Sequence, residues 1–102
     1  MITTDITVDE LKERLNKGET PVIIDVREEY EYQEGNIPGA KNIPLNSLPH
    51  HLDDLEDLKE QEVIVQCRSG KRSATAQAFL QQQGFSNVRN LVGGMLAYEE
   101  QR

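Results

Sequence analysis

Cys67 stands among three cations, Arg68, Lys71 and Arg72, in a chain that contains no other cysteine. The thiolate is the nucleophilic form of cysteine, and at an unperturbed pKa of about 8.5 only about 3% of a cysteine is thiolate at pH 7. Neighbouring cations and the N-terminus of a helix both favour the charged sulfur. These residue types at this spacing therefore indicate an activated cysteine nucleophile.

A lone cysteine after an apolar strand can also be a small buried residue without chemistry. The three neighbouring charges do not suit an inert apolar pocket, and Gly70 permits a close approach of the backbone. We therefore favour the nucleophile over the structural cysteine.

Two segments place Cys67 between a strand and a helix. Residues 62–66 form an apolar run typical of a buried strand, and residues 73–83 carry apolar side chains at helical spacing before Gly84 ends the pattern. A helix that follows a strand and a short loop leaves backbone N–H groups unpaired at its positive end, and these form a cradle for an anion. We expect the thiolate of Cys67 to be that anion.

The spacing from Cys67 to Arg72 helps to choose the reaction. It is C-x4-R, one residue shorter than the C-x5-R of cysteine-based phosphatases, which would place their arginine at Ser73. A phosphatase loop must surround three phosphoryl oxygens beyond the sulfur, whereas a tighter ring suits a smaller load such as one additional sulfur atom. We therefore expect sulfur transfer, with a phosphatase or arsenate reductase as the alternative among cysteine enzymes.

The other segments alternate between helical and extended patterns. We predict extended segments over 22–26, 42–44 and 88–91, and helices over 8–16, 28–33, from near Ser47 to 58, and over 95–100. Strands that alternate with helices imply βαβ units, which give an α/β fold with a mainly parallel sheet covered on both faces. Ligands bind such sheets beyond the carboxyl ends of the strands, which is where Cys67 lies.

Composition limits the class of protein and its partners. The 102 residues suffice for a single domain, 1–102, with one core. The formal net charge of -7 opposes binding to phosphate backbones or anionic lipid, so we expect neither nucleic acid nor membrane partners. Because no apolar run approaches the roughly 20 residues that cross a bilayer, and no basic and apolar leader is present, we expect a cytoplasmic protein.

Two other groups of titratable residues are not expected to do chemistry. His50 and His51 lie near Asp53 and Asp54, but adjacent residues of a helix do not face one point, and a single cysteine excludes an internal disulfide or a zinc site of four cysteines. We therefore expect no metal. An acidic stretch is expected to form a solvated face beside a turn; its members are Glu28, Glu29, Glu31 and Glu34.

Several short motifs follow one another along the chain. They are ITVDEL at 6–11, DVRE at 25–28, EY at 31–32, GNIPGA at 35–40, NIP at 42–44, CRSGKRS at 67–73 and LVGG at 91–94. In this order and spacing the chain resembles the single-domain rhodaneses of the thiosulfate sulfurtransferase family. The resemblance implies a three-layer α/β fold with a central, mainly parallel five-stranded sheet flanked by helices, and it implies no cofactor.

The same resemblance implies a double-displacement reaction. Cys67 would take the outer sulfur of a small anionic donor such as thiosulfate, release sulfite, carry a persulfide, and pass the sulfur to cyanide or an external thiol. Since the chain has no second cysteine to resolve the persulfide, the acceptor must come from outside, as a small nucleophile or a thiol of a partner protein. A non-catalytic binding module with this fold is the alternative from another class, and the intact cysteine with its three cations argues against it.

Individual roles follow from matching positions in these motifs. Cys67 would be the nucleophile and persulfide carrier, while Asp25 and Arg27 would support the loop through hydrogen bonds. The loop would stabilise the terminal sulfur through its backbone N–H groups and bind the donor's oxyanion through its cations; its residues are Arg68, Ser69, Gly70, Lys71, Arg72 and Ser73. Two positions depart from the family pattern, Asn36 in place of a usual His and Tyr98 in place of a common Trp, and both lie outside the loop.

Overall fold

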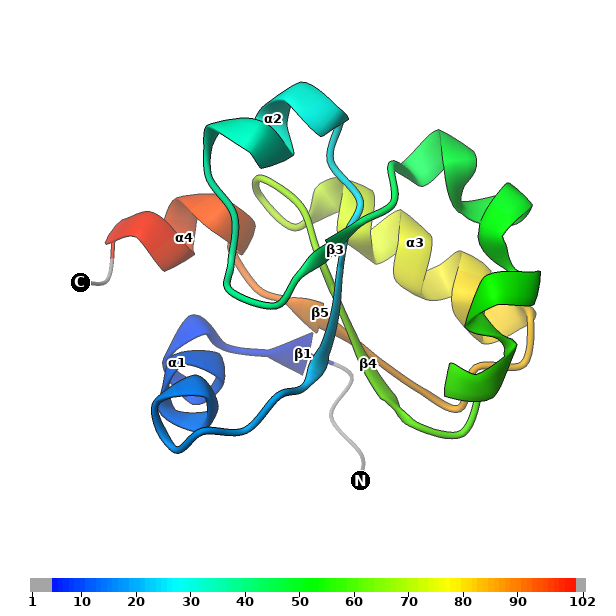
Figure 1. Cartoon of the computed structure of the whole chain (residues 1–102), viewed down its shortest axis with the longest axis horizontal. Helices are drawn as coiled ribbons and strands as arrows, with labels where there is room; N and C mark the ends of the chain where they lie inside the picture. Colours follow the sequence, from blue (N-terminus) through cyan, green and yellow to red (C-terminus); the bar gives the residue numbers. More distant parts are fainter. Residues whose placement is uncertain (1–4, 101–102) are drawn as a thin grey trace.

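The computed structural model describes residues 5–100 as alternating strands and helices (Figure 1). In chain order the elements are β1 (Asp5–Ile6), α1 (Val8–Asn16), β2 (Val22–Asp25), α2 (Glu29–Glu34), β3 (Lys41–Asn42), the 3-10 helices η1 (Leu45–His51) and η2 (Asp53–Leu58), β4 (Glu62–Gln66), α3 (Lys71–Gln82), β5 (Asn87–Leu91) and α4 (Gly94–Glu100). Among these helices of residues 5–100, none has the length and apolar character needed to cross a membrane.

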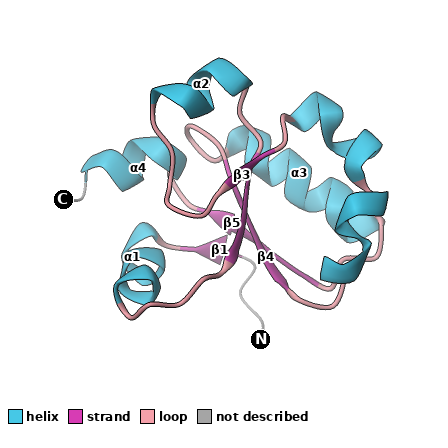
Figure 2. Cartoon of the chain, in the orientation of Figure 1, coloured by secondary structure: helices cyan, strands magenta, loops and turns pink. Residues whose placement is uncertain are grey.

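The five strands form one sheet in the order β1-β5-β4-β2-β3, and every pair of neighbours is parallel. Helices cover both faces, with α3, η1 and η2 on one and α1 and α4 on the other (Figure 2). The predicted fold, a three-layer α/β structure with a five-stranded parallel sheet, is confirmed. The carboxyl ends of the strands meet at one edge of the sheet. The loop that follows β4, which begins with Cys67, lies at this edge.

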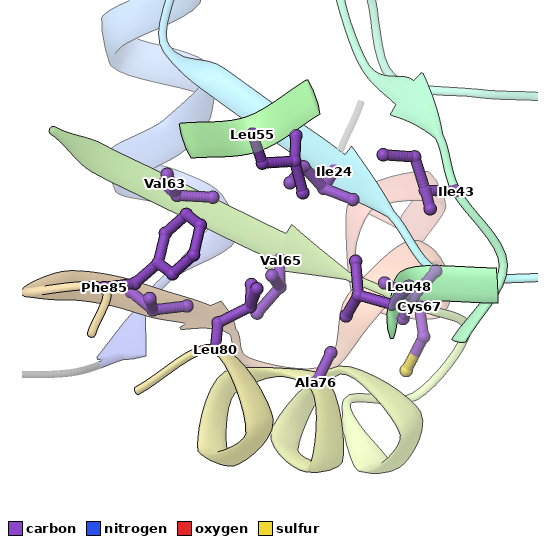
Figure 3. Close-up of a cluster of buried hydrophobic side chains, with 12 residues drawn as sticks. Ile24, Ile43, Leu48, Leu55, Val63, Val65, Cys67, Ala76, Leu80 and Phe85 are labelled. Atoms are coloured by element: carbon purple, nitrogen blue, oxygen red, sulfur yellow. The ribbon is translucent and has the colours of Figure 1, made fainter. Parts of the chain in front are cut away.

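The side of the sheet that Cys67 faces follows from the alternation along β4. Val63 and Val65 point toward α3 and the 3-10 helices, whereas Ile64 points toward α1 and α4. Cys67 continues the odd-numbered series and therefore lies on the α3 side. Figure 3 shows it at one end of this apolar cluster, with its sulfur beside the first turn of α3.

Most predicted elements agree with the structure, and two segments differ. The helix over 8–16 and the strand over 62–66 have the predicted bounds, and Thr7 Oγ1 accepts a hydrogen bond from Glu10 N at 3.1 Å, as expected for an N-cap. The strand β1 has only two residues and no pattern that could predict it from the sequence; only the family resemblance implied a fifth strand.

The segment before β4 is the clearest correction. The sequence predicts one helix from near Ser47 to residue 58, but the structure has two consecutive 3-10 helices, the first of which begins at Leu45 and contains Pro49. A proline ring in an α-helix collides with the carbonyl four residues earlier, which here belongs to Leu45. The tighter 3-10 turns, with bonds such as Ser47 N to Pro44 O at 2.8 Å, avoid that collision.

Candidate active site

The sulfur of Cys67 lies within a ring of hydrogen-bond donors formed by its own loop. Its Sγ accepts hydrogen bonds from Gly70 N at 3.1 Å and Ser73 N at 3.3 Å, and the Ser73 hydroxyl lies 3.3 Å away. Gly70 precedes α3 with φ of 106°, a left-handed conformation that a side chain would strain, and this conformation turns the chain back over the sulfur. The loop thus forms the anion cradle that the sequence predicts.

Burial and hydrogen bonding act on this thiol in opposite directions. Burial raises the pKa of the Cys67 thiol, but hydrogen bonds from the Ser73 hydroxyl and from the amides of Ser73, Gly70 and Ser69 lower it, and the net pKa lies below the ordinary value. The thiol is therefore shifted toward the nucleophilic form. Because Cys67 is only 1% exposed, a donor can reach Sγ only when neighbouring atoms move aside.

Asn90, on the neighbouring strand β5, binds the middle of the loop and its C-terminal end. Its Nδ2 donates to Gly70 O at 3.2 Å, and its Oδ1 accepts from the Ser73 hydroxyl at 2.5 Å. Asn90 is not among the site residues predicted from the sequence. The sequence feature that could have identified Asn90 is its position as a polar residue near the carboxyl end of a predicted strand. Ligands of parallel sheets bind at this edge.

The three cations of the loop have different surroundings. Arg68 and Lys71 are exposed, whereas Arg72 donates from Nη1 and Nη2 to the two carboxylate oxygens of Glu31, at 2.7 and 3.0 Å. This pairing raises the pKa of Arg72 and lowers the pKa of Glu31 to about 2. The prediction that the whole acidic stretch is solvated is wrong for Glu31, whose side chain is 13% exposed. The motif EY at 31–32 includes Glu31 but not Glu29 or Glu34, and no local pattern indicates that the Glu31 side chain is largely buried.

A small cavity of about 150 Å³ connects α2, the loop and α4. It is lined by Arg27, Glu31, Glu34, Gly35, Arg68, Met95, Leu96 and Glu99. The cavity thus combines three carboxylates with two guanidinium groups beside the cysteine loop.

Asp25 and Arg27 form a buried ion pair at the end of β2. Arg27 Nη2 donates to Asp25 Oδ2 at 2.8 Å and to Gly35 O at 2.7 Å, and Arg27 N donates to Asp25 Oδ1 at 3.0 Å. Asp25 also lies opposite Gln66, the residue before Cys67, in the parallel pairing of β2 with β4. The pair therefore lies next to the loop, but its side-chain hydrogen bonds join Asp25 to Arg27 and Arg27 to the turn at Gly35. The prediction of hydrogen bonds from this pair to the loop is thus corrected: within residues 5–100, both side chains bind elsewhere.

The first turn of α4 binds the loop from the other side. Met95 N donates to Cys67 O at 2.8 Å, and Leu96 N donates to Arg68 O at 3.0 Å. A Cβ atom on Gly94 would lie 2.6 Å from Arg68 O, so the close contact of α4 with the loop requires a glycine here. The motif LVGG at 91–94 includes Gly94, but its sequence alone does not predict this contact.

The two departures from the family pattern lie away from the sulfur. Asn36 is exposed and donates to Tyr32 O at 3.0 Å, and Tyr98 packs on the α1 side of the sheet with Lys12 Nζ 4.5 Å from its ring centre. The sequence predicts no metal site among His50, His51, Asp53 and Asp54. In the structure, His51 Nδ1 lies 3.3 Å from Asp54 Oδ2. Over residues 5–100, no group of three His, Cys, Asp or Glu side chains is arranged to hold a metal ion.

Comparisons with known proteins agree with this architecture. The family model described as Rhodanese-like domain matches residues 7–101. The chain is 35% identical over 97 residues to a sulfurtransferase of Allochromatium vinosum, covering 95% of this chain and 89% of that protein. It is 40% identical over 95 residues to the putative sulfurtransferase YtwF of Bacillus subtilis, covering 93% and 89%. The crystal structure of a rhodanese-like domain protein from Staphylococcus aureus superposes with a TM-score of 0.82 at 36% identity, covering 94% and 91%.

Proposed function

This chain belongs to the family of rhodanese-like domains, whose single-domain relatives include sulfurtransferases, and from that membership we propose that it is a thiosulfate sulfurtransferase. It would move a sulfane sulfur from a donor such as thiosulfate, through a persulfide on Cys67, to cyanide or an external thiol. The observation that carries the proposal is the position of Cys67 Sγ, held by the amides of Gly70 and Ser73 at the start of α3.

In the first half-reaction the thiolate of Cys67 attacks the outer sulfur of thiosulfate. A new S–S bond forms on Cys67, the S–S bond of thiosulfate breaks, and sulfite leaves with the electron pair. Sulfite is a good leaving group, so this step requires no proton donor. The amides of Gly70 and Ser73 then stabilise the charge on the persulfide.

In the second half-reaction an acceptor attacks the outer sulfur of the persulfide. Cyanide leaves as thiocyanate and regenerates the Cys67 thiolate, and a thiolate acceptor leaves as a new persulfide. Because the sequence has a single cysteine, the acceptor comes from solution or from a partner protein.

The loop cations would attract and orient the anionic donor. Arg68 and Lys71 are exposed on the rim of the loop, and Arg72 lies in the first turn of α3. The ion pair of Asp25 with Arg27 would support the loop from β2.

Intact-mass spectrometry tests the proposal directly. Brief exposure to thiosulfate should add one sulfur atom to the protein, and subsequent cyanide should remove it. The Cys67→Ser variant, which keeps size and polarity, should gain no sulfur. The proposal is contradicted if Cys67→Ser takes up sulfur equally well, or if the wild-type protein hydrolyses an aryl phosphate and gains no sulfur from any donor.

A further inference from the structure

Arg72, the arginine that the donor would use, already forms an ion pair with Glu31. Both terminal nitrogens of Arg72 donate to the carboxylate, at 2.7 and 3.0 Å, in the bidentate geometry that an oxyanion would also adopt. Glu31 is itself fixed, because its Oε1 also accepts a hydrogen bond from Glu28 N at 3.0 Å in the capping box of α2. A donor's oxyanion must therefore displace a carboxylate that is already in place.

The neighbouring cavity gives a small dianion little compensation. Its wall contains Glu31, Glu34 and Glu99. Of its two guanidinium groups, that of Arg27 already binds Asp25 and Gly35 O, while Arg68 is exposed to solvent. These carboxylates have the same sign of charge as the donor and therefore oppose its binding.

We propose that Glu31 is a specificity-determining residue, which disfavours small dianionic donors such as thiosulfate relative to persulfide donors that carry no oxyanion. The inference rests on the proposed function, since it assumes that Cys67 accepts sulfur. It assigns to the acidic stretch after β2 a role in selecting the donor.

The variant Glu31→Gln separates this role from a structural one. The glutamine Oε1 can still accept from Glu28 N and from one nitrogen of Arg72, so the start of α2 is kept. The amide group in place of Oε2 cannot accept from the second nitrogen of Arg72, and the negative charge is gone. Glu29→Gln is the matched control, because Glu29 lies on the same helix, is exposed, and has its side-chain bond with Gln33.

The measurement is the second-order rate constant for sulfur uptake by Cys67, followed by quenched intact-mass spectrometry. One donor is thiosulfate, and the other is an alkyl hydropersulfide with an uncharged alkyl group. In the second reaction the Cys67 thiolate attacks the outer sulfur, the S–S bond of the donor breaks, and the alkyl thiolate leaves. Glu31→Gln should raise the constant for thiosulfate about fivefold or more and change that for the hydropersulfide by less than about twofold. Glu29→Gln should change both by less than about twofold.

The effect must also depend on Arg72. In an Arg72→Ala background, Glu31→Gln should favour thiosulfate less than it does when Arg72 is present, since no arginine is released. The inference is overturned if Glu31→Gln leaves the thiosulfate constant unchanged or lower, accelerates both donors equally, or acts equally without Arg72. Failure of the proposed function would look different, because the wild-type protein would then take up sulfur from neither donor.

Discussion

At the residue scale, the Ser73 hydroxyl has one proton and two neighbours that can accept it. Asn90 Oδ1 lies 2.5 Å away and Cys67 Sγ lies 3.3 Å away. While Cys67 is a thiol, its S–H can donate to Ser73 and Ser73 can donate to Asn90. When Cys67 loses its proton, the Ser73 hydroxyl stabilises the thiolate only by turning away from Asn90.

Removal of the Ser73 hydroxyl should therefore destabilise the thiolate form of Cys67 relative to the thiol. In Ser73→Ala the pKa of Cys67 should rise, because a hydrogen bond to the charged form is lost while the backbone amide remains. The pH dependence of alkylation by iodoacetamide measures this pKa as the midpoint of the rate increase. Thr75→Val removes another hydroxyl of α3, one that faces Lys71 O, and should leave the midpoint unchanged. An unchanged midpoint in Ser73→Ala would show that the amides alone set the pKa.

At the element scale, the loop depends on how closely α4 approaches it. Gly94→Ala would force a methyl group against the carbonyls of Cys67 and Arg68 and separate α4 from the loop. We expect a loss of about 2 to 3 kcal/mol in the free energy of unfolding, measured in urea, and a slower uptake of sulfur.

Gly18→Ala provides the control for this substitution. Gly18 also has a positive φ, of 87°, but a Cβ there would meet nothing within 4 Å. The variant should lose about 1 to 2 kcal/mol through backbone strain alone and take up sulfur at the wild-type rate. Equal rates of sulfur uptake in both variants would mean that α4 does not position the loop.

The elements also show which parts of the structure the sequence could predict. The strand β4 and the helix α1 depend on local features, an apolar run and a cap at Thr7, and both were predicted to the residue. The contacts of Glu31 with Arg72 and of Asn90 with Ser73 join residues 41 and 17 positions apart, respectively. Such contacts depend on strand order and on side-chain direction, which no local pattern contains. Cys67 could be predicted because its own neighbours in sequence form its surroundings.

At the scale of the whole molecule, a network of charges joins α1 to the strands. Glu62 accepts from Arg14 Nη2 at 2.7 Å and from Arg89 Nη1 at 3.1 Å, and Arg89 also donates to Glu10. The bonds from Arg14 and Arg89 hold the pKa of Glu62 below its usual value despite burial. The pKa of Glu31 is likewise low, at about 2. The fold is therefore stabilised by carboxylates that must stay ionised.

The free energy of unfolding should consequently fall in acid. A carboxylate with a lowered folded-state pKa contributes its full stabilisation above the unfolded-state pKa of about 4.3, and the contribution is lost as the pH falls through the folded-state value. Glu62→Gln should lower the free energy of unfolding by about 1 to 2 kcal/mol at pH 7, and the difference from wild type should shrink as the pH falls below about 4.

Urea unfolding at a series of pH values measures this difference. The exposed Glu60 provides the control, since Glu60→Gln should match the wild-type protein to within about 0.5 kcal/mol throughout. A difference between Glu62→Gln and wild type that is the same at pH 3 and pH 7 would contradict the assignment of the network.

The contact of α4 with Cys67 O and Arg68 O also has a consequence for biosynthesis. The helix α4 follows every other described element in the chain, so a ribosome that has just translated the cysteine loop has not yet made the helix that braces it. We expect the loop to take its final shape only after residues 94–100 have left the exit tunnel and docked.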